Sequence, residues 1–549
     1  MKKTQRLVGK YYLFTFLTIG CLNLKAQNKT IILGRPTDNS VTISIAFDQN
    51  VEYLFEYGIQ SGVYTNTSAV FTNIANTPDE KDLTGLTANT KYFYRVKYKT
   101  VGASNYIISN EYAFITQRTK GSTYTFTIES DEHLYDKKGV KSMYQVCLNN
   151  QANDKPDFML SLGDIFGDDH NPFTITSAEL DVLHANYRPF LGSICHSIPF
   201  YVCLGNHEGE NDYYLGKTPP NNLAIWGTLA RKNYYPNPFP NSFYSGNTDV
   251  EPYGVGNPEN YYAWTWGDAQ FIVLDVYRDE CDTSAKPQGW NWSLGLPQYT
   301  WLKNTLEAST SKYKFVFAHH IRGQGRGGVT NAQLYEWGGL NKLGGTNTFA
   351  ANRPGWAKPI HQLFIDNKVN IFFQGHDHVF AHEVLDSITY QALPMAADST
   401  YEIGMLANAD AYVSDTVAGT GHLRVTVSPI NVKVDFVRAY LPADTLSGAH
   451  KNGEVAFSYT VGGKTNVGVN DVLAIADLKL YPNPARNEVT ILSSQNYKLE
   501  EVTIYNSVGQ LQLQTPINTF DISNFSNGIY FVNIKTENAL VVKKLVVNK

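Results

Sequence analysis

The sequence has 549 residues, of which 43% are apolar and 17% are charged. A chain of this length and apolar content can form three or four folded units and is too apolar to be disordered. Its formal net charge of −5 provides no basic excess for a phosphate backbone, so we expect no nucleic acid partner.

The N-terminal residues 1–26 have the layout of a secretory signal peptide. Four basic residues occur among the first ten, an apolar stretch runs from Tyr11 to Leu22, and Ala26 ends a short polar region. We predict cleavage after Ala26 and an exported, soluble protein. The apolar stretch is shorter than the ~20 residues of a membrane-spanning helix, and no other segment reaches that length. A lipid-modified Cys21 is the less favoured alternative, because the residues before it match that signal poorly.

The mature chain keeps four cysteines, Cys147, Cys195, Cys203 and Cys281. Neither their positions nor their spacing is typical of a disulfide framework or of a cysteine-based zinc site. Their pairing stays open.

From Thr30 to Thr116 the pattern predicts a β-sandwich. Short alternating runs such as 41–45 and 92–96 are separated by Asn, Gly and Pro turns. The run LTGLTANTKYFYRV, residues 83–96, resembles the Leu-x-Pro-x-Thr-x-Tyr corner of fibronectin type III modules and of the N-terminal domain of purple acid phosphatases. Ala88 stands at the usual proline position, so the match is incomplete.

Between about Gly121 and Thr460 apolar strand-like runs alternate with helical stretches. Apolar residues recur on one side of Val140–Asn150 and of Leu296–Ala308, which predicts two helices. Alternating strands and helices predict a layered α/β core.

Two polar, Gly-rich and aromatic inserts, Glu210–Asn260 and Ile321–Trp356, are longer than ordinary connections. We predict that they are lids or pocket walls, and decorative loops are the alternative. Four aromatic residues of the first insert are candidates for shaping substrate choice: Tyr213, Tyr214, Trp226 and Tyr234.

After Gly462 a short linker leads to a third predicted domain, which is β-rich. Its segments include LKLYPNPARNEVTI, VTIYNSVGQLQL and DISNFSNGIYFVNI, and the chain closes with KKLVVNK. These segments resemble the C-terminal sorting domain of the type IX secretion system of Bacteroidetes. The resemblance implies the type IX secretion machinery as a partner, a secreted or cell-surface location, and removal of the tail. Another adhesive β-sandwich is the alternative.

Five polar clusters of the core each follow directly on an apolar, strand-like run. In open α/β sheets, ligands bind beyond the carboxyl ends of the strands, so we expect the five clusters to converge. The clusters are Asp131 with His133, Asp164, Asn206 with His207, His319, and His376 with His378.

An extended backbone would place Asp131 and His133 on one face, and His376 and His378 likewise. Each pair is therefore expected to bind one centre. The donor groups are carboxylates, imidazoles and an amide without a thiolate, which suits iron, manganese or zinc and argues against a structural zinc site.

In chain order, D-x-H, G-D, G-N-H-E, H and G-H-x-H resemble the signature of the calcineurin-like metallophosphoesterases, whose relatives include the purple acid phosphatases. The resemblance covers about residues 122–395, with a β-rich stretch around His422–Tyr440 completing the second sheet. It implies an α/β fold: a four-layer β-sandwich flanked by helices, between N-terminal and C-terminal all-β sandwich domains.

The resemblance also implies two divalent or trivalent metal ions. One would be bound by Asp131, His133, Asp164 and His378, and the other by Asp164, Asn206, His319 and His376. Asp164 would bridge the two ions, and a metal-bound hydroxide would attack phosphorus. His207 would bind no metal and would protonate the leaving group. The purple enzymes carry a tyrosine where Gly167 stands here, so we expect no purple colour.

Several further polar residues are candidates for substrate binding. His320 follows His319 directly, and Arg322 and Arg326 lie in a Gly-rich run where a guanidinium can hold a phosphate. His382 and the segment 168–170 are further candidates. The other histidines are expected to have no site role, namely His184, His196, His361, His422 and His450.

The sequence therefore predicts a secreted hydrolase of small phosphate esters, with phosphomonoesters ahead of diesters. A phosphodiesterase or nucleotide hydrolase is the alternative, and a surface adhesin with an inactive phosphoesterase core is the alternative from another class. The predicted domains are a signal peptide at 1–26, a fibronectin type III-like sandwich at 28–118, a phosphoesterase core at 119–462, a linker at 463–477 and a sorting domain at 478–549.

Overall fold

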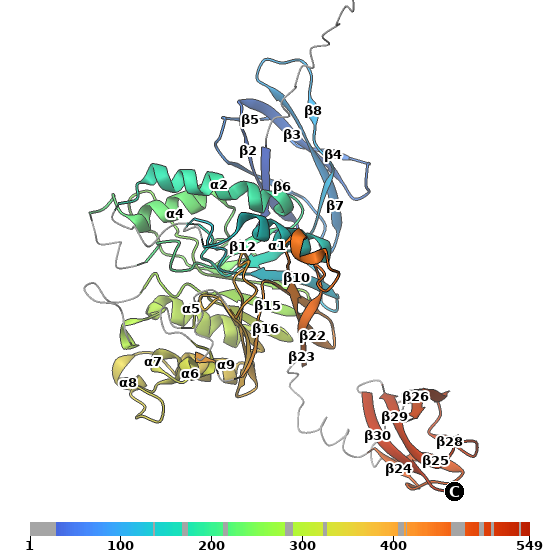
Figure 1. The fold of residues 1–549 in the computed structure, drawn as a ribbon. Helices are drawn as coiled ribbons and strands as arrows, with labels where there is room; N and C mark the ends of the chain where they lie inside the picture. Colours follow the sequence, from blue (N-terminus) through green and yellow to red (C-terminus); the bar gives the residue numbers. More distant parts are fainter. Residues whose placement is uncertain are drawn as a thin grey trace, which may run out of the picture. The chain divides into compact units, whose positions relative to one another are not determined.

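The structure is a computed structural model of the chain (Figure 1). It describes residues 29–135, 138–166, 174–211, 218–279, 289–321, 327–403, 411–412, 414–462, 478–492, 499–506, 510–536 and 540–549. The chain divides into two compact units, Met1–Gly463 and Lys464–Lys549, which are described separately.

The first unit begins with two antiparallel sheets that enclose one apolar core. One sheet consists of β1 (Lys29–Gly34), β2 (Ser40–Phe47) and β6 (Asp79–Thr84). The other consists of β3 (Val51–Gly58), β4 (Asn66–Thr67), β5 (Phe71–Asn73), β7 (Lys91–Thr100), β8 (Ile107–Ile108) and β9 (Tyr112–Ile115). Alternate residues of β7 are buried, as expected for a sandwich strand. The Thr87 N–H donates to the Tyr92 hydroxyl (2.9 Å), which is the hydrogen bond of a tyrosine corner.

The rest of the first unit, from Tyr124 to Gly462, contains two larger sheets. The six-stranded sheet has the order β12 (Phe200–Val202), β11 (Met159–Ser161), β10 (Tyr124–Glu129), β21 (Gly421–Val427), β22 (Asn431–Arg438) and β23 (Val455–Gly462). Strands β10, β11 and β12 are parallel, and β21 joins β10 antiparallel. The predicted stretch His422–Tyr440 thus forms strands, but these complete the same sheet as β10.

The second sheet has eight strands. Their order is β13 (Ser245–Gly246), β14 (Tyr262–Trp266), β15 (Ala269–Val273), β16 (Tyr313–Phe317), β17 (Ile371–Gln374), β19 (Ile388–Ala392), β18 (Phe380–Leu385) and β20 (Asp415–Val417). Strands β15, β16, β17 and β19 are parallel to one another.

The two sheets pack face to face, and helices cover their outer faces. Phe126 of β10 and Phe271 of β15 meet edge to face at 5.1 Å within the shared core. The helices against the six-stranded sheet are α1 (Lys141–Asp154), α2 (Ser177–Cys195) and α4 (Leu223–Tyr234). Those against the other sheet are α5 (Gly295–Ala308), α6 (Val329–Ala332), α7 (Tyr335–Gly338) and α9 (Ile360–Asp366). The short helix α8 (Phe349–Asn352) contacts α7. Short 3-10 turns lie at Gly289–Asn291 and Pro442–Thr445.

Figure 1 shows α2 and α4 on one side of the sheets and α5 to α9 on the other. The order is therefore helix, sheet, sheet, helix, which confirms the predicted four-layer α/β architecture. Both predicted helices are present as α1 and α5.

Arg188 of α2 links the N-terminal sandwich to the core by hydrogen bonds, and this residue is only 2% exposed. Its guanidinium donates to Thr30 Oγ1 (2.8 Å), to the Ser44 carbonyl (2.8 Å) and to the Tyr234 carbonyl. Burial lowers the pKa of Arg188 to about 10. Because one buried cation bonds residues of β1, β2 and α4, these elements are held in one unit.

The second unit is a smaller β-sandwich. One sheet consists of β24 (Lys479–Tyr481), β25 (Glu488–Leu492) and β28 (Thr519–Asp521). The other consists of β27 (Leu511–Thr515), β26 (Leu499–Asn506), β29 (Gly528–Thr536) and β30 (Leu540–Val547). Val489, Ile504 and Val532 lie in its core.

Within the described residues, no helix is long and apolar enough to span a membrane. Cys147, Cys195 and Cys203 are buried free thiols, and Cys281 lies outside the described residues.

Candidate metal centre

The five predicted clusters lie just beyond the carboxyl ends of strands, as expected. Strands β10, β11 and β12 run parallel in one sheet, and β16 and β17 run parallel in the other. Because the two sheets pack face to face, the loops that leave these five strands meet at one end of the sandwich.

The pairs share a face for a reason that differs from the prediction. Asp131 and His133 do not continue the extended strand, since β10 ends at Glu129. Five residues of the clusters have a left-handed backbone: Asp131 (φ 56°), His133 (46°), Asp164 (59°), His376 (66°) and His378 (55°). Such backbone costs about 1–3 kcal/mol per residue and persists where the surroundings enforce it, typically at functional sites. The alternation argument was therefore wrong, although the side chains do converge.

Glycines let the loops approach one another. A Cβ atom at Gly205 would lie 2.2 Å from Oδ1 of Asp164, and one at Gly375 would lie 2.6 Å from Oδ2 of Asp131. These distances are far below a normal contact, so any larger residue at either position would displace a carboxylate. The glycines that begin the G-N-H-E and G-H-x-H motifs are thus steric requirements of the site.

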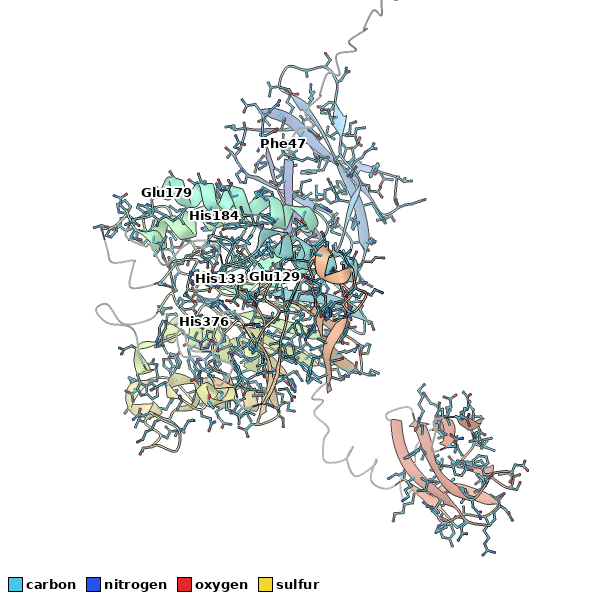
Figure 2. All side chains as sticks on the ribbon, in the orientation of Figure 1. Phe47, Glu129, His133, Glu179, His184 and His376 are labelled. Carbon is cyan, nitrogen blue, oxygen red and sulfur yellow. The ribbon has the colours of Figure 1, made fainter. Side chains whose placement is uncertain are left out.

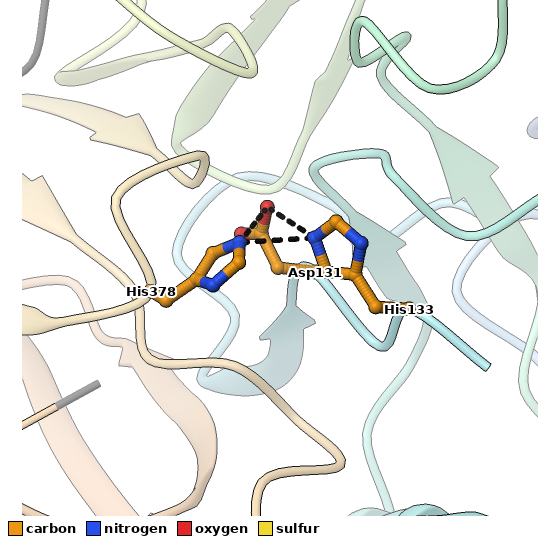
Figure 3. Close-up of side chains that lie close together, drawn as sticks. All are labelled: Asp131, His133 and His378. Carbon is orange, nitrogen blue, oxygen red and sulfur yellow. Dashed lines mark hydrogen bonds and ion pairs between the residues drawn. The ribbon is translucent and has the colours of Figure 1, made fainter. Parts of the chain in front are cut away.

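Asp131, His133 and His378 form the first group of candidate ligands (Figure 3). The two Nε2 atoms lie 2.9 Å apart, and Oδ1 of Asp131 lies 3.8 Å from Nε2 of His133 and 3.5 Å from Nε2 of His378. All three residues are buried. A carboxylate and two imidazoles that face one another so closely suit a bound cation.

Asp164, His319 and His376 form a second group. Nε2 of His319 lies 3.2 Å from Oδ2 of Asp164 and 3.3 Å from Nδ1 of His376. Asn206 belongs to the same loop region, because the N–H of the next residue, His207, donates to Oδ1 of Asp164 (2.8 Å). Asn206 and His376 are partly exposed, so this side of the cluster is open.

Asp164 connects the two groups. Its Oδ2 lies 3.7 Å from Nε2 of His133 and 3.9 Å from Nε2 of His207, and these three residues form a third group that can hold an ion. The rings of His133 and His207 meet edge to face at 4.8 Å. The geometry therefore also allows His207 a ligand position, which the sequence resemblance does not give it.

Residues 124–380 match the family model for calcineurin-like phosphoesterases. These residues form a calcineurin-like phosphoesterase domain. Residues 479–548 match the model for a secretion system C-terminal sorting domain. No curated protein matches the sequence.

Two of the solved structures that match this chain are similar to it in fold. The structure of PhoD has a TM-score of 0.56 at 17% identity, covering 79% of this chain and 90% of that one. A purple acid phosphatase from yellow lupin (Lupinus luteus) seeds has a TM-score of 0.52 at 15% identity, covering 79% of this chain and 74% of that one. At these identities the likeness shows the fold alone.

The charged groups of the ligand cluster shift one another's pKa values. Burial alone would raise the pKa of Asp131, but His133, His319 and His378 hold it well below its usual range. The pKa of Asp164 is likewise lowered by His319 and His207, against the effect of burial. In return the two carboxylates raise the pKa of His319 to about 9, although burial opposes this. Negative charge is therefore stable where cations would bind.

Backbone and side-chain partners orient the candidate ligands of the phosphoesterase domain. Nδ1 of His319 bonds the Leu162 carbonyl (2.8 Å), and Nδ1 of His133 bonds the Tyr135 hydroxyl (2.8 Å). In both rings the other nitrogen, Nε2, thus faces the carboxylates. Tyr135 was not predicted; its position two residues after His133 was the available signal.

Glu208, the last residue of G-N-H-E, joins the loop of Asp164 to the loop of Gly205 by hydrogen bonds. Its carboxylate accepts the N–H groups of Asp164 (2.9 Å), Ile165 (2.8 Å) and Gly205 (2.5 Å). Burial, followed by the charge of Asp164, raises the pKa of Glu208 to about 7.

His320 is buried behind the second group. Its ring lies 4.8 Å from that of His376, and its Nε2 lies 3.8 Å from Oδ2 of Asp377. Asp377 also accepts the Tyr412 hydroxyl (2.6 Å) and the Gly327 N–H (2.7 Å). His320 thus lies beside a candidate ligand. Neither Asp377 nor Tyr412 was predicted.

Other predicted substrate residues are placed differently. His382 lies on β18 with its Nδ1 3.5 Å from Asp415 and its ring 4.3 Å from that of Tyr459, so the structure does not bring it into the cluster. Arg322, Arg326 and the segment 168–170 lie outside the described residues.

The remaining histidines have structural partners, as expected. His184 lies on α2 against Phe166, apart from His133 and His376 (Figure 2). The others pair as follows: His196 with Tyr112, His361 with Tyr390 and Asp386, His422 with Asp154, and His450 with Tyr440.

The first insert contains packed structure. Tyr234 is buried at the end of α4, and Trp226 is partly buried on the same helix against Leu223. Arg231 of α4 forms a buried two-point ion pair with Glu210 (2.6 and 2.9 Å). Tyr213 and Tyr214 lie outside the described residues. This part of the insert is therefore a helical layer on α2.

Proposed function

We propose that this protein is an exported phosphoesterase that hydrolyses phosphate esters with two bound metal ions. The observation that carries the proposal is the position of Asp164. Its carboxylate contributes to two of the candidate ligand groups, one with His319 and His376 and the other with His133 and His207.

The donor groups fit the proposed ions. Asp131, His133, Asp164 and His378 would hold one ion, and Asp164, Asn206, His319 and His376 would hold the other. Carboxylate, amide and imidazole donors suit iron, manganese or zinc. Ions of this kind, when bound, supply Lewis-acid stabilisation of phosphoryl oxygens and acidify water.

His207 is proposed to donate a proton to the leaving oxygen. Its backbone N–H donates to Oδ1 of Asp164 (2.8 Å), and its imidazole ring lies against the rings of His133 and Tyr135. This places an imidazole beside the cluster on a rigid backbone, as a general acid requires.

Phosphomonoesters are the proposed substrates, and diesters or nucleotides are the alternative. A surface-binding role for an inactive core is disfavoured, because the candidate ligand residues are all present and six of them form the described groups. The test is hydrolysis of matched mono- and diesters by the purified protein, loaded in turn with iron, manganese and zinc. Hydrolysis of monoesters alone would support the proposal. No hydrolysis with any ion would leave the surface-binding role.

The sorting-domain match supports export to the cell surface or exterior by the type IX machinery. We propose that the mature protein begins near Gln27 and that the tail is removed within 463–477. Mass spectrometry of secreted protein tests this, and an intact C-terminal Lys549 would contradict it.

A further inference from the structure

A large open groove lies along the edge of the eight-stranded sheet, where α5 passes beside β13 and β14. Its volume is about 1000 Å³, at the upper end of the range for ligand sites. Residues 117–120, which connect the N-terminal sandwich to the core, close one part of it. None of the candidate metal ligands lines this groove.

One wall of the groove comes from α5. Pro297, Thr300, Trp301, Asn304 and Ala308 line it, and their spacing of three and four residues places them on one face of the helix. Thr300 and Asn304 are exposed. This helical face is therefore a surface that a ligand can contact directly.

An aromatic pair lies in the groove. The rings of Trp301 and Tyr261 are 4.9 Å apart, and Nε1 of Trp301 donates to Oγ of Ser245 (3.3 Å), which ties α5 to β13. The indole is thus held in place by both neighbours and stays partly exposed. A fixed aromatic ring of this kind offers a flat apolar platform.

The rest of the lining is polar and electrically balanced. More than half of the lining residues are Ser, Thr, Asn or Gln. The Arg118 guanidinium is paired with Asp157 at two points (2.7 and 2.8 Å). The other charged residues of the lining are one cation, Lys120, and one carboxylate, Asp249. Such a lining disfavours anionic ligands, including phosphate esters.

Gln270 supplies an unused buried acceptor. Its residue is 8% exposed, it lines the groove, and its Oε1 has no hydrogen-bond partner within the described part of the chain. A buried amide oxygen without a hydrogen-bond partner is unfavourable, and a ligand that donates a hydrogen bond to it would remove that cost.

From these features we infer that the groove binds a neutral oligosaccharide. Sugars present flat C–H faces that pack on aromatic rings, and hydroxyls that both donate to and accept from amides and side-chain hydroxyls. The partly exposed Trp301 provides the platform, supported from behind by the buried ring of Tyr261, and Gln270, Asn304 and Thr300 provide the polar partners. The protein would thereby be held on glycan while its metal centre acts independently.

The test is calorimetric titration of the full chain with neutral hexasaccharides of glucose, xylose, mannose and N-acetylglucosamine. At least one is expected to bind with a Kd below about 1 mM. Trp301→Ala is expected to weaken that binding at least about tenfold, as for other central aromatic anchors.

A second variant guards against misfolding of the first. Asn304→Arg fills the groove from an exposed position and should also weaken binding at least about tenfold. Glu307→Arg, on the same helix but outside the lining, and Trp290→Ala are the matched controls and should bind as the unmutated chain does. Nitrophenyl phosphate hydrolysis should be equal in all variants.

The inference is overturned if no saccharide of the panel binds, or if binding persists in both Trp301→Ala and Asn304→Arg. Binding of an extended peptide that these two variants abolish, without saccharide binding, would also overturn it. None of these outcomes depends on whether the metal centre is active.

Discussion

A Cβ atom added at Gly205 would lie 2.2 Å from Oδ1 of Asp164. Gly205→Ala should therefore displace this carboxylate from its neighbours and remove metal and activity together. Elemental analysis and hydrolysis rates measure the two effects. Gly462→Ala is the control, since its added Cβ would meet no atom within 4 Å. Full metal content in Gly205→Ala would show that the loops tolerate the side chain.

The buried pair of Glu210 and Arg231 should be important for stability. Glu210→Gln leaves the Arg231 cation, whose side chain is 0% exposed, without its charged partner. The free energy of unfolding should fall by about 3–5 kcal/mol. Urea denaturation measures it, and Glu307→Gln, which breaks an exposed pair with Lys303, should change it by no more than about 0.5 kcal/mol. Equal effects would mean that the buried pair does not anchor the insert.

His184 should make the free energy of unfolding decrease as the pH falls below about 6.5. Burial, with a smaller effect of Arg231, lowers the pKa of His184 to about 3, below the value near 6.5 of the unfolded chain. Between these values the unfolded state binds more protons, so this residue's contribution to stability is complete above pH ~6.5 and is lost as pH falls. The slope is at most about 1.4 kcal/mol per pH unit.

His184→Phe should remove this part of the slope, because Phe carries no proton and the site is lined by aromatic rings. Unfolding free energies of both proteins between pH 4 and pH 8 test the prediction. A difference between them that does not change with pH would contradict it.

His207→Asn should keep both metals and lower turnover by about 10²–10⁴, the usual contribution of a general acid. The loss should be smaller for nitrophenyl esters, whose leaving groups need little protonation, than for alkyl phosphates. Equal losses would assign His207 to phosphate positioning, and loss of metal would make it a ligand, as its position near His133 and Asp164 allows.

Much of the candidate site could be predicted from the sequence, because each motif is a short contiguous run that follows a strand. The convergence of Asp131, His133 and His378 is the clearest case. Their left-handed backbone could not be predicted, since it is enforced by contacts between loops, such as that of Gly375 with Asp131.

Supporting residues were missed for a related reason. Tyr412 reaches Asp377 from a distant segment, and the Leu162 carbonyl orients His319 through its backbone. Tyr412 is far in sequence from the motif of Asp377, and a backbone carbonyl can be supplied by any residue type, so neither partner could be recognised from the sequence. The insert after G-N-H-E was expected to be a lid or pocket wall because its composition is polar and aromatic. The helix α4 within it was not predicted, since its buried face packs against α2, which lies earlier in the chain.

The central claim is that Asp164 joins two metal ions, and it is tested most directly by counting bound metal in the purified protein and in Asp164→Asn. The unmutated protein should contain close to two ions per chain, and Asp164→Asn should lose at least one of them together with metal-dependent hydrolysis. An unmutated protein without bound metal, or an Asp164→Asn variant with unchanged metal content, would contradict the claim.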